Sequence, residues 1–472
     1  MKVNEKFNDP EFGPTKTDRD GKFSLYPDGN PPGPGEIDPS EVEWYRPAQI
    51  CPKPQWMDSE GVNAGDVAQG ALGDCWFISA LGSLAANSQD SILSNMDPMT
   101  LEKLDSGQPL TREIWNVLKG SLFSPLFHYY ATKGMYVIRF MKNYKWHYII
   151  MDDKLPCNSD KYPLYAKDKN LKEYWVSLIE KAYAKLHGNY YYLTSGFIHE
   201  ALTDLTGSVP LKVDLNELKE DSDPTPTKID DFWNQLMLWG RNSMMGCSVK
   251  GAAEGQILKY GVPTGILSGH AYSILDTFKI DKDYGKGRSR LLRIRNPWGD
   301  TEWRGKWADD SEQIQERKEA IRAHYQQVRK EICFSKYHIK MANMEKWEED
   351  PIDDGNFFMC YKDWRELFTT MYVCKNFFHD NEYNAVRFGY SWTEDNNGGT
   401  PMKSTKEAFE MWGKNPYVKI SVREASVALI ICVSQEDPRM KEKSLFPYPG
   451  ILHYFCFTVL ACEGMLQTSV PV

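Results

Sequence analysis

The chain reads Gln-Gly-Ala-Leu-Gly-Asp-Cys-Trp over residues 69–76. This stretch leads into the segment that decides the fold of the first half of the chain. Apolar residues recur between 76 and 85 at helical spacing, so we predict a mostly buried helix over 75–86. Cys75 stands in the first turn of that helix, where the helix dipole favours a thiolate over a thiol. Taken alone, Cys75 is more typical of a buried structural cysteine, because free cysteines are among the most buried residues.

A nucleophilic thiol needs a base, and the base needs a group that orients it. His270 lies in Gly-His-Ala-Tyr-Ser-Ile (269–274), and Asn296 lies in Arg-Ile-Arg-Asn-Pro-Trp-Gly (293–299). Residues 269–280 and 288–296 alternate in polarity around the turn-forming segment 281–287, which predicts a β-hairpin. Pairing His270 with Asn296 centres the turn at 283 and makes the two side chains cross-strand neighbours. Singly they are typical of a core histidine and a turn residue, but Cys, His and Asn in this order indicate papain-like nucleophilic catalysis.

Gln69 lies six residues before Cys75. Its side-chain amide is placed to donate to a carbonyl oxygen under attack, together with the backbone N–H of Cys75, as an oxyanion-hole donor. Without these neighbours Gln69 would be an ordinary loop glutamine.

Composition limits the classes of function. The chain has 472 residues, and 56 basic against 65 acidic residues give a net charge of −9, which argues against nucleic-acid binding. The length suggests about three domains. Charged residues near the start argue against a secretory signal, and no apolar run reaches the ~18 residues of a membrane span. The ten cysteines include no CxxC pair, which argues against a zinc site and a disulfide framework. We therefore expect a cytoplasmic protein with reduced thiols.

The order of predicted elements indicates an α+β fold. Residues 1–43 are rich in Pro, Gly and Asp and are expected to bury little, as an irregular arm. Strands are predicted at 136–140 and 146–151, a helix at 174–183 closed by Gly188, a polar link at 219–224, and an amphipathic insertion at 311–347. Short β runs after 378 predict an all-β module. The predicted domains are 1–43, 44–209, 210–377 and 378–472.

From residue 7 to about 370 the chain resembles the protease core of calpains. The motifs that carry the resemblance lie at 7–12, 43–47, 69–76, 178–185, 246–248, 269–273 and 293–299. The resemblance implies a two-lobed papain-like fold, with Cys75 in one lobe, His270 and Asn296 in the other, and protein substrates bound between them as extended chains.

The resemblance also implies two calcium sites, because the family's protease core binds two calcium ions through oxygen ligands. In the first lobe the matching positions are the carboxylates of Asp66 and Glu173 and the carbonyls of Ser59 and Gly61. In the second lobe they are Glu302, Asp309 and Asp354, the carbonyl of Ile352, and position 356. Asn356 stands where the family usually has a glutamate, so the second site has one negative ligand fewer.

Two further features follow from the resemblance. Trp298 matches the tryptophan that wedges between the lobes in the absence of calcium. The segment after 378 resembles the family's β-sandwich through Trp392, 397–399 and 409–416, although it is short. The sequence contains no EF-hand loop of the pattern D-x-[DN]-x-[DN]-G-x₅-E, and it leaves a regulatory subunit open.

We interpret the sequence as a calcium-dependent intracellular cysteine endopeptidase that performs limited proteolysis. A calcium-responsive binding or scaffold protein on the same fold is the alternative, although catalytic decay usually removes Cys, His or Asn and all three are present. Acyl transfer to an amine, as in transglutaminases, is disfavoured because those enzymes have an Asp where Asn296 stands.

Overall fold

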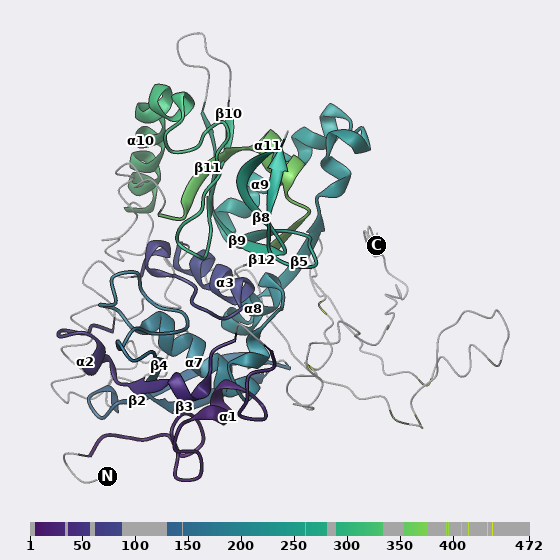
Figure 1. Cartoon of the computed structure of the whole chain (residues 1–472). Helices are drawn as coiled ribbons and strands as arrows, with labels where there is room; N and C mark the ends of the chain where they lie inside the picture. The colour runs from purple at the N-terminus through teal and green to yellow at the C-terminus, as the bar shows by residue number, and fades with distance from the viewer. Residues whose placement is uncertain are drawn as a thin grey trace. The chain divides into compact units, whose positions relative to one another are not determined.

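The computed structural model describes residues 5–33, 36–56, 62–86, 130–143, 145–259, 261–280, 289–333 and 354–375, with single positions at 393, 395, 407, 414, 432 and 437. The chain divides into one compact unit of Met1–Asn384 with Asp437–Tyr448 and a second of Ala385–Glu436 with Pro449–Val472. Every helix and strand below belongs to the first unit (Figure 1). The predicted β module at 378–472 lies outside the described residues except at the six single positions.

The part of the first unit before residue 208 combines helices with short antiparallel strands. Its helices are α1 (Lys22–Leu25), α2 (Pro47–Ile50), α3 (Cys75–Ala86), α7 (Trp175–His187) and α8 (Ile198–Thr206), with the 3-10 turns η1 (Pro39–Glu41), η2 (Ala64–Asp66) and η3 (Tyr191–Leu193). Its strands are β1 (Glu43–Tyr45), β2 (Met135–Lys142), β3 (Lys145–Asp152) and β4 (Leu155–Cys157). β2 pairs with β3, and β1 pairs with β4.

The later part is built on a six-stranded antiparallel sheet of order β11-β10-β9-β6-β12-β5. The strands are β5 (Val209–Asp214), β6 (Ser243–Val249), β9 (His270–Ile280), β10 (Ser289–Arg295), β11 (Asn356–Cys360) and β12 (Thr370–Lys375). A separate hairpin joins β7 (Gly255–Lys259) to β8 (Val262–Ser268). The helices are α9 (Pro226–Asn242), α10 (Glu312–Cys333) and α11 (Tyr361–Leu367), with the turns η4 (Asn216–Leu218) and η5 (Glu220–Ser222). The mixed α+β content agrees with the predicted class, and the division into two lobes stays a prediction.

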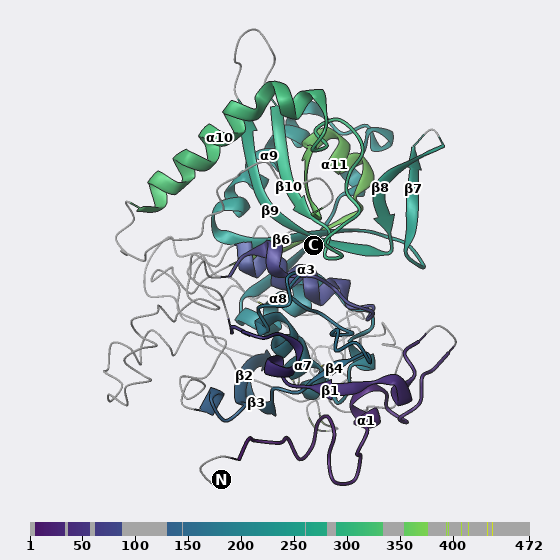
Figure 2. The ribbon, with the colours of Figure 1, turned by 60° about the vertical axis from the view of Figure 1, so that its left-hand side comes forward.

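Helix α3 lies directly against the large sheet, next to β6 and β9 (Figure 2). Every residue of α3 except Ala86 is buried. Ser83 Oγ accepts a hydrogen bond from Met245 N at 3.0 Å, and Ser273 Oγ donates to Ser79 O at 2.7 Å. A Cβ at Gly82 would lie 2.7 Å from Ser273 Oγ, so the absence of a side chain there allows the close approach of α3 to β9. These contacts fix α3 relative to the sheet.

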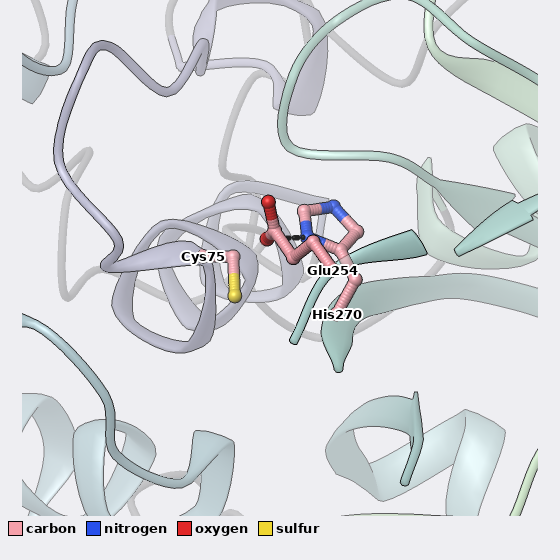
Figure 3. A group of neighbouring side chains, drawn as sticks. All are labelled: Cys75, Glu254 and His270. Carbon is pink, nitrogen blue, oxygen red and sulfur yellow. Dashed lines mark hydrogen bonds and ion pairs between the residues drawn. The ribbon is translucent and has the colours of Figure 1, made fainter. Parts of the chain in front are cut away.

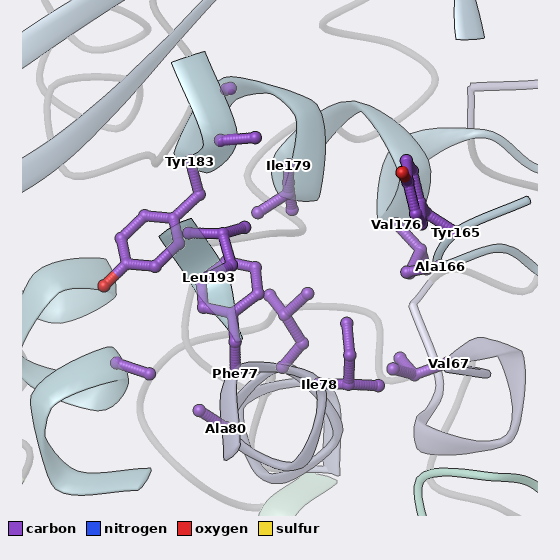
Figure 4. Close-up of a cluster of buried hydrophobic side chains, with 14 of the residues drawn as sticks. Val67, Phe77, Ile78, Ala80, Tyr165, Ala166, Val176, Ile179, Tyr183 and Leu193 are labelled. Carbon is purple, nitrogen blue, oxygen red and sulfur yellow. The ribbon is translucent and has the colours of Figure 1, made fainter. Parts of the chain in front are cut away.

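The opposite side of α3 packs on α7 in a dense apolar cluster (Figure 4). The rings of Phe77 and Tyr183 stack with centroids 4.2 Å apart and planes 6° from parallel. Ile78, Val176 and Ile179 are all fully buried in the same cluster. Burying each such side chain contributes roughly 1.5–3 kcal/mol relative to leaving it exposed, so α3 is held firmly from both sides.

Most predicted elements are confirmed. The helix predicted at 75–86 is α3 with those bounds, and the helix predicted at 174–183 is α7, which extends to His187 and ends at Gly188 with a φ of 109°. The two predicted strand blocks form the β2–β3 hairpin, and the amphipathic segment after 311 begins as α10. The part of that segment beyond 333 lies outside the described residues.

Two expectations are wrong. Residues 5–43 are largely irregular. They were expected to bury little, but Phe12, Leu25 and Tyr26 are at most 3% exposed. The connection to the large sheet does not fall at 219–224, since β5 already pairs with β12 along its whole length. β5 is an edge strand of the sheet, and side chains such as Leu211 are exposed on it.

Candidate active site

Cys75 is the first residue of α3. The carbonyl of Asp74 accepts hydrogen bonds from Phe77 N at 2.8 Å and Ile78 N at 3.1 Å, so the helix begins at this point. Cys75 is 9% exposed and stands at the N-terminal end of the helix dipole, which favours a negative charge on the sulfur. The thiol therefore combines limited access with a positive local field.

His270 is the first residue of β9 and is 1% exposed. Its backbone pairs with Val249 of β6. The imidazole lies between two aromatic rings, with centroids 4.9 Å from Trp298 and 5.0 Å from Tyr272. These ring contacts restrict the rotation of the imidazole, so its two nitrogens point in fixed directions.

Asn296 follows β10 and fixes one side of the imidazole. Its Nδ2 donates to the carbonyls of Asp300 at 2.9 Å and Thr301 at 2.8 Å. Because carbonyls only accept, this pair of bonds turns Oδ1 toward His270, whose Nε2 lies 2.9 Å away. Nε2 therefore carries a proton, and Nδ1 is the nitrogen left for other partners.

The other nitrogen of His270 faces Cys75 and a third side chain, Glu254 (Figure 3). Nδ1 lies 2.6 Å from Glu254 Oε1, and one ligand atom from each of the three residues lies within 4.8 Å of the others. Burial alone would lower the pKa of His270, but hydrogen bonds to Cys75, Glu254 and Asn296 and attraction to Cys75 raise it to about 9. The imidazole is accordingly protonated at neutral pH.

The register of the β9–β10 hairpin differs from the predicted one. Arg295 pairs with Ser273 and Ile294 with Ile274, and a bulge shifts the register between Ile294 and Arg293. His270 is therefore not directly opposite Asn296, which lies beyond the end of β10. The side chains still meet because the Asn296 amide turns toward the imidazole, so the predicted proximity holds although the predicted pairing does not.

Gln69 lies beside the segment that carries Asn296. Its backbone N donates to the carbonyl of Pro297 at 2.8 Å. Its Nε2 donates to Leu72 O at 2.7 Å, which uses one of the two amide hydrogens. The second hydrogen remains available for a substrate oxygen, which is compatible with the predicted role of Gln69.

Arg295 connects the surroundings of the site to the first part of the chain. It is 1% exposed, and its Nη2 donates to the carbonyls of Gly65 at 3.1 Å and Val67 at 2.9 Å. On the other side, Nη1 lies 3.2 Å from Asn356 Oδ1 and 3.3 Å from Asp354 O. Lys169 Nζ also donates to Asp354 O, at 3.0 Å. Arg295, which is buried, and Lys169, which is exposed, thus join the two parts of the unit next to the catalytic candidates.

Two buried carboxyl groups lie beneath the start of α3. Asp74 is 0% exposed, and Glu180 of α7 is 1% exposed. Burial raises the pKa of both groups, and repulsion from Asp74 raises that of Glu180 further. Ala166 N donates to the Glu180 carboxyl at 3.1 Å. A proton is therefore retained in this pair at pH values where an exposed carboxyl would have lost it.

The carboxylates assigned to the first calcium site both serve as hydrogen-bond acceptors. Asp66, at the end of η2, accepts from Asn63 N at 2.9 Å. Glu173 is 7% exposed and accepts from Trp175 Nε1 at 2.8 Å. Ser59 and Gly61, which were expected to complete this site, lie outside the described residues.

The residues assigned to the second calcium site lie partly together. Glu302 Oε1 accepts from Gly355 N at 2.6 Å, next to Asp354. Asn356 turns its Nδ2 toward Asp354 Oδ2, at 3.1 Å, and its oxygen toward Arg295. Glu302, Asp309 and Asp354 do not form a group of three ligand atoms within 4.8 Å among the described residues, and Ile352 lies outside them. Asn356 thus belongs to the hydrogen-bond shell of Arg295, and its role as a calcium ligand stays a prediction.

Trp298, the predicted lobe wedge, packs against the imidazole of His270. Its backbone N also donates to Asn296 Oδ1 at 3.1 Å. A wedge role in another state of the protein stays a prediction.

Sequence reasoning missed Glu254. No motif marks this residue, which lies in the loop between β6 and β7. The loop packs closely on Gly269, which has a φ of 66° and at which a Cβ would lie 3.0 Å from Glu254 N, so the position of Glu254 depends on tertiary packing.

A thiol at a helix start, an imidazole and an orienting amide form the class of site that cysteine peptidases use. Residues 7–375 match the family described as calpain family cysteine protease, and the chain belongs to that family.

Curated relatives agree with this assignment. The chain is similar to the calpain-type cysteine protease DEK1 of Arabidopsis thaliana, with 29% identity over 91% of this chain and 16% of that protein. It is 28% identical to calpain-5 of Mus musculus over 92% of this chain and 60% of that protein. Calpain-13 of Rattus norvegicus is 30% identical over 71% of this chain and 41% of that protein. The chain therefore spans less than two thirds of the length of these relatives. In the described part of the chain, no helix has both the length and the apolar character needed to cross a bilayer.

Proposed function

We propose that the protein is a calcium-dependent intracellular cysteine endopeptidase that cuts protein substrates at a few sites. The observation that carries the proposal is the placement of His270, with Nε2 on the Asn296 amide and Nδ1 facing Cys75. Cys51, Cys75, Cys157, Cys247 and Cys360 form no disulfide, which suits a reducing compartment.

In this proposal the Cys75 thiolate attacks the carbonyl carbon of the scissile peptide bond. The carbonyl π electrons move to the oxygen, which the Cys75 backbone N–H and the second Gln69 amide hydrogen stabilise. As the C–N bond breaks, the Nδ1 proton of the His270 imidazolium passes to the leaving amine. The products are a free amine and an acyl group attached to sulfur.

Water completes the cycle. The neutral Nδ1 of His270 removes a proton from water while its oxygen attacks the thioester carbon. The C–S bond then breaks, and the carboxylic acid leaves with the thiolate and imidazolium restored. Asn296 keeps Nε2 protonated throughout, so the same nitrogen serves as acid and then as base.

Calcium would act away from the reacting atoms. Asp66 and Glu173, with the carbonyls of Ser59 and Gly61, are the proposed ligands of the first ion. The proposed ligands of the second ion are Glu302, Asp309 and Asp354, the carbonyl of Ile352 and the neutral side chain of Asn356. Bound calcium would supply positive charge that draws separate loops together. The described donors of the first set are carboxylates of the required kind, whereas Asn356 weakens the second set.

A covalent active-site probe tests the proposed function. The full chain is incubated with a peptidyl epoxide at zero and at millimolar calcium, and its intact mass is measured beside the cleavage of an unfolded protein substrate. We expect one adduct per chain and substrate cleavage, both increased by calcium. A scaffold protein would bind calcium but would form no adduct and cleave no substrate. An acyl transferase would incorporate an amine into the substrate in place of cleaving it.

The pH profile of peptide hydrolysis should report His270. Its raised pKa keeps the imidazolium present above neutral pH, so kcat/KM should fall only as the pH rises through about 9. Glu254→Gln removes a charged hydrogen-bond partner of Nδ1 and should move this alkaline limb to lower pH. An alkaline limb below pH 7 in the unmodified chain would contradict the proposed ion pair.

The calcium requirement should depend on the charge at position 356. Asn356→Glu should lower the calcium concentration for half-maximal peptidase activity by roughly 10-fold, equivalent to ~1.4 kcal/mol, because ligand charge controls calcium affinity. Asn356→Gln lengthens the side chain without adding charge and is the matched control. If both variants show the same calcium requirement, the assignment of residue 356 to a calcium site is wrong.

A further inference from the structure

Cys75, Glu254 and His270 form a cluster of three potential metal ligands. They come from the start of α3, from the loop before β7 and from the start of β9, and Figure 3 shows them as neighbours. One atom from each, Sγ, a carboxylate oxygen and an imidazole nitrogen, lies within 4.8 Å of the other two. In the part of the chain that the structure describes, this is the only such group of His, Cys, Asp or Glu side chains.

The backbone around Glu254 holds its carboxylate beside the imidazole. Gly269 N donates to Val249 O at 2.8 Å, and a Cβ at Gly269 would lie 2.6 Å from Ala253 O. Ser268 Oγ lies 3.3 Å from the same carbonyl and 3.2 Å from Gly255 O. The loop is therefore packed directly on the residue that precedes His270. The Glu254 side chain is 37% exposed, so an ion can reach the carboxylate from solvent.

The ligand types suit Zn²⁺. Zinc in proteins binds thiolate, imidazole and carboxylate, and sites with three protein ligands keep a fourth position for water. Calcium and magnesium prefer oxygen donors alone. Asn296 holds Nε2 in its protonated form, which directs the lone pair of a neutral imidazole to Nδ1, the atom that faces the cluster.

The distances require only small side-chain movements. Tetrahedral zinc with the usual bond lengths separates its sulfur, nitrogen and oxygen ligands by about 3.4–3.6 Å. Nδ1 and Oε1 are 2.6 Å apart across a hydrogen-bonding proton, and one imidazole nitrogen and one carboxylate oxygen lie within 4.8 Å of the sulfur. Replacing that proton by a metal moves Nδ1 and Oε1 apart by less than 1 Å.

We propose that Zn²⁺ binds reversibly to Cys75 Sγ, His270 Nδ1 and Glu254, with water as the fourth ligand, and blocks the site. Zinc replaces the Nδ1 proton, which passes to solvent, and no bond in the protein is broken. The spacing of the cysteines argued against a zinc site. That argument concerns local motifs only and does not detect this site, because the fold brings its three ligands together from separate segments. The inhibitory part rests on the proposed peptidase function, whereas the binding part does not.

Binding is measured first, with a readout independent of activity. The full chain, reduced with a phosphine, is titrated with Zn²⁺ against a chromophoric chelator, and with Co²⁺ to detect thiolate-to-metal charge transfer. The variants are Glu254→Gln, Cys75→Ala and the control Glu217→Gln, which changes a glutamate that is 73% exposed and paired with Lys228. We expect Glu254→Gln to weaken zinc binding at least about 10-fold and Cys75→Ala to remove the charge-transfer band of this site. Glu217→Gln should match the unmodified chain.

Inhibition is then measured on peptide hydrolysis, each variant relative to its own zinc-free rate. Zinc should inhibit the unmodified chain, a nitrogen-donor chelator that prefers zinc to calcium should restore the rate, and Glu254→Gln should raise the inhibition constant at least about 10-fold. Equal zinc affinity in Glu254→Gln and the unmodified chain would overturn the site, even if the protein is an active peptidase. Zinc binding that depends on Cys75 and Glu254 in a protein without peptidase activity would support the site and refute the proposed function.

Discussion

Replacing Cys75 with alanine should abolish peptide hydrolysis while leaving the fold intact. The sulfur is the atom proposed to attack the substrate, and nucleophile and base act as a unit, so we expect a loss of roughly 10⁴–10⁶-fold in kcat. Alanine suits the first turn of a helix, and Cys75 is only one of many buried residues of α3. Initial rates with a fluorogenic peptide, beside far-UV and near-UV circular dichroism, measure both effects.

Cys51→Ala is the matched control for this experiment. Cys51 is a half-buried thiol that follows α2 and takes no part in the cluster around His270. It should retain the full rate. Hydrolysis that persists in a folded Cys75→Ala protein would eliminate the proposed mechanism, whereas loss of activity in Cys51→Ala alone would place the nucleophile elsewhere.

Replacing Lys181 with methionine should cause a large loss of stability. Lys181 and Asp152 are at most 1% exposed, and Nζ donates to Asp152 Oδ1 at 2.6 Å, to Asp152 O at 3.0 Å and to Lys154 O at 2.7 Å. Burial alone would raise the pKa of Asp152, but the attraction and hydrogen bond of Lys181 outweigh it and the pKa is lowered. Removing the ammonium leaves a buried carboxylate without its counter-charge, which costs about 3–5 kcal/mol.

The midpoint of urea unfolding, followed by tryptophan fluorescence, measures this loss. Lys228→Met is the control, because Lys228 and Glu217 form an exposed pair, and such pairs contribute at most about 1 kcal/mol. The double variant Lys181→Met with Asp152→Asn should recover part of the loss, since it removes the uncompensated charge. A double variant less stable than Lys181→Met would show that the cost arises from packing and not from charge.

The parts of the site that follow a local pattern could be predicted from the sequence. The bounds of α3 follow from apolar spacing, and the order of Cys75, His270 and Asn296 identified the candidates before any distance was known. The register of β9 and β10 could not be predicted, because no turn residue or motif in the sequence locates the one-residue bulge between Arg293 and Ile294. Glu254 could not be found either, because its position depends on how a loop packs on Gly269.

The N-terminal segment illustrates a different limit. Its composition predicts little burial, yet a few apolar side chains such as Leu25 enter the core, and Asp9 forms an ion pair with Lys185 at 2.7 Å. Composition averages over the segment, whereas packing depends on single residues at particular positions. The same reason explains why β5 was missed: an edge strand is recognised by its partner β12 and not by its own sequence.

The buried pair of Asp74 and Glu180 adds an uptake of hydrogen ions to the folding of this protein. In the unfolded chain both carboxyl groups are ionised at neutral pH, whereas burial raises their pKa in the native state, so the native state binds more protons. The contribution of the pair to stability is greatest below the ordinary carboxyl range and diminishes as the pH rises through the raised pKa values. The heat of refolding consequently includes the ionisation enthalpy of whichever buffer supplies the proton.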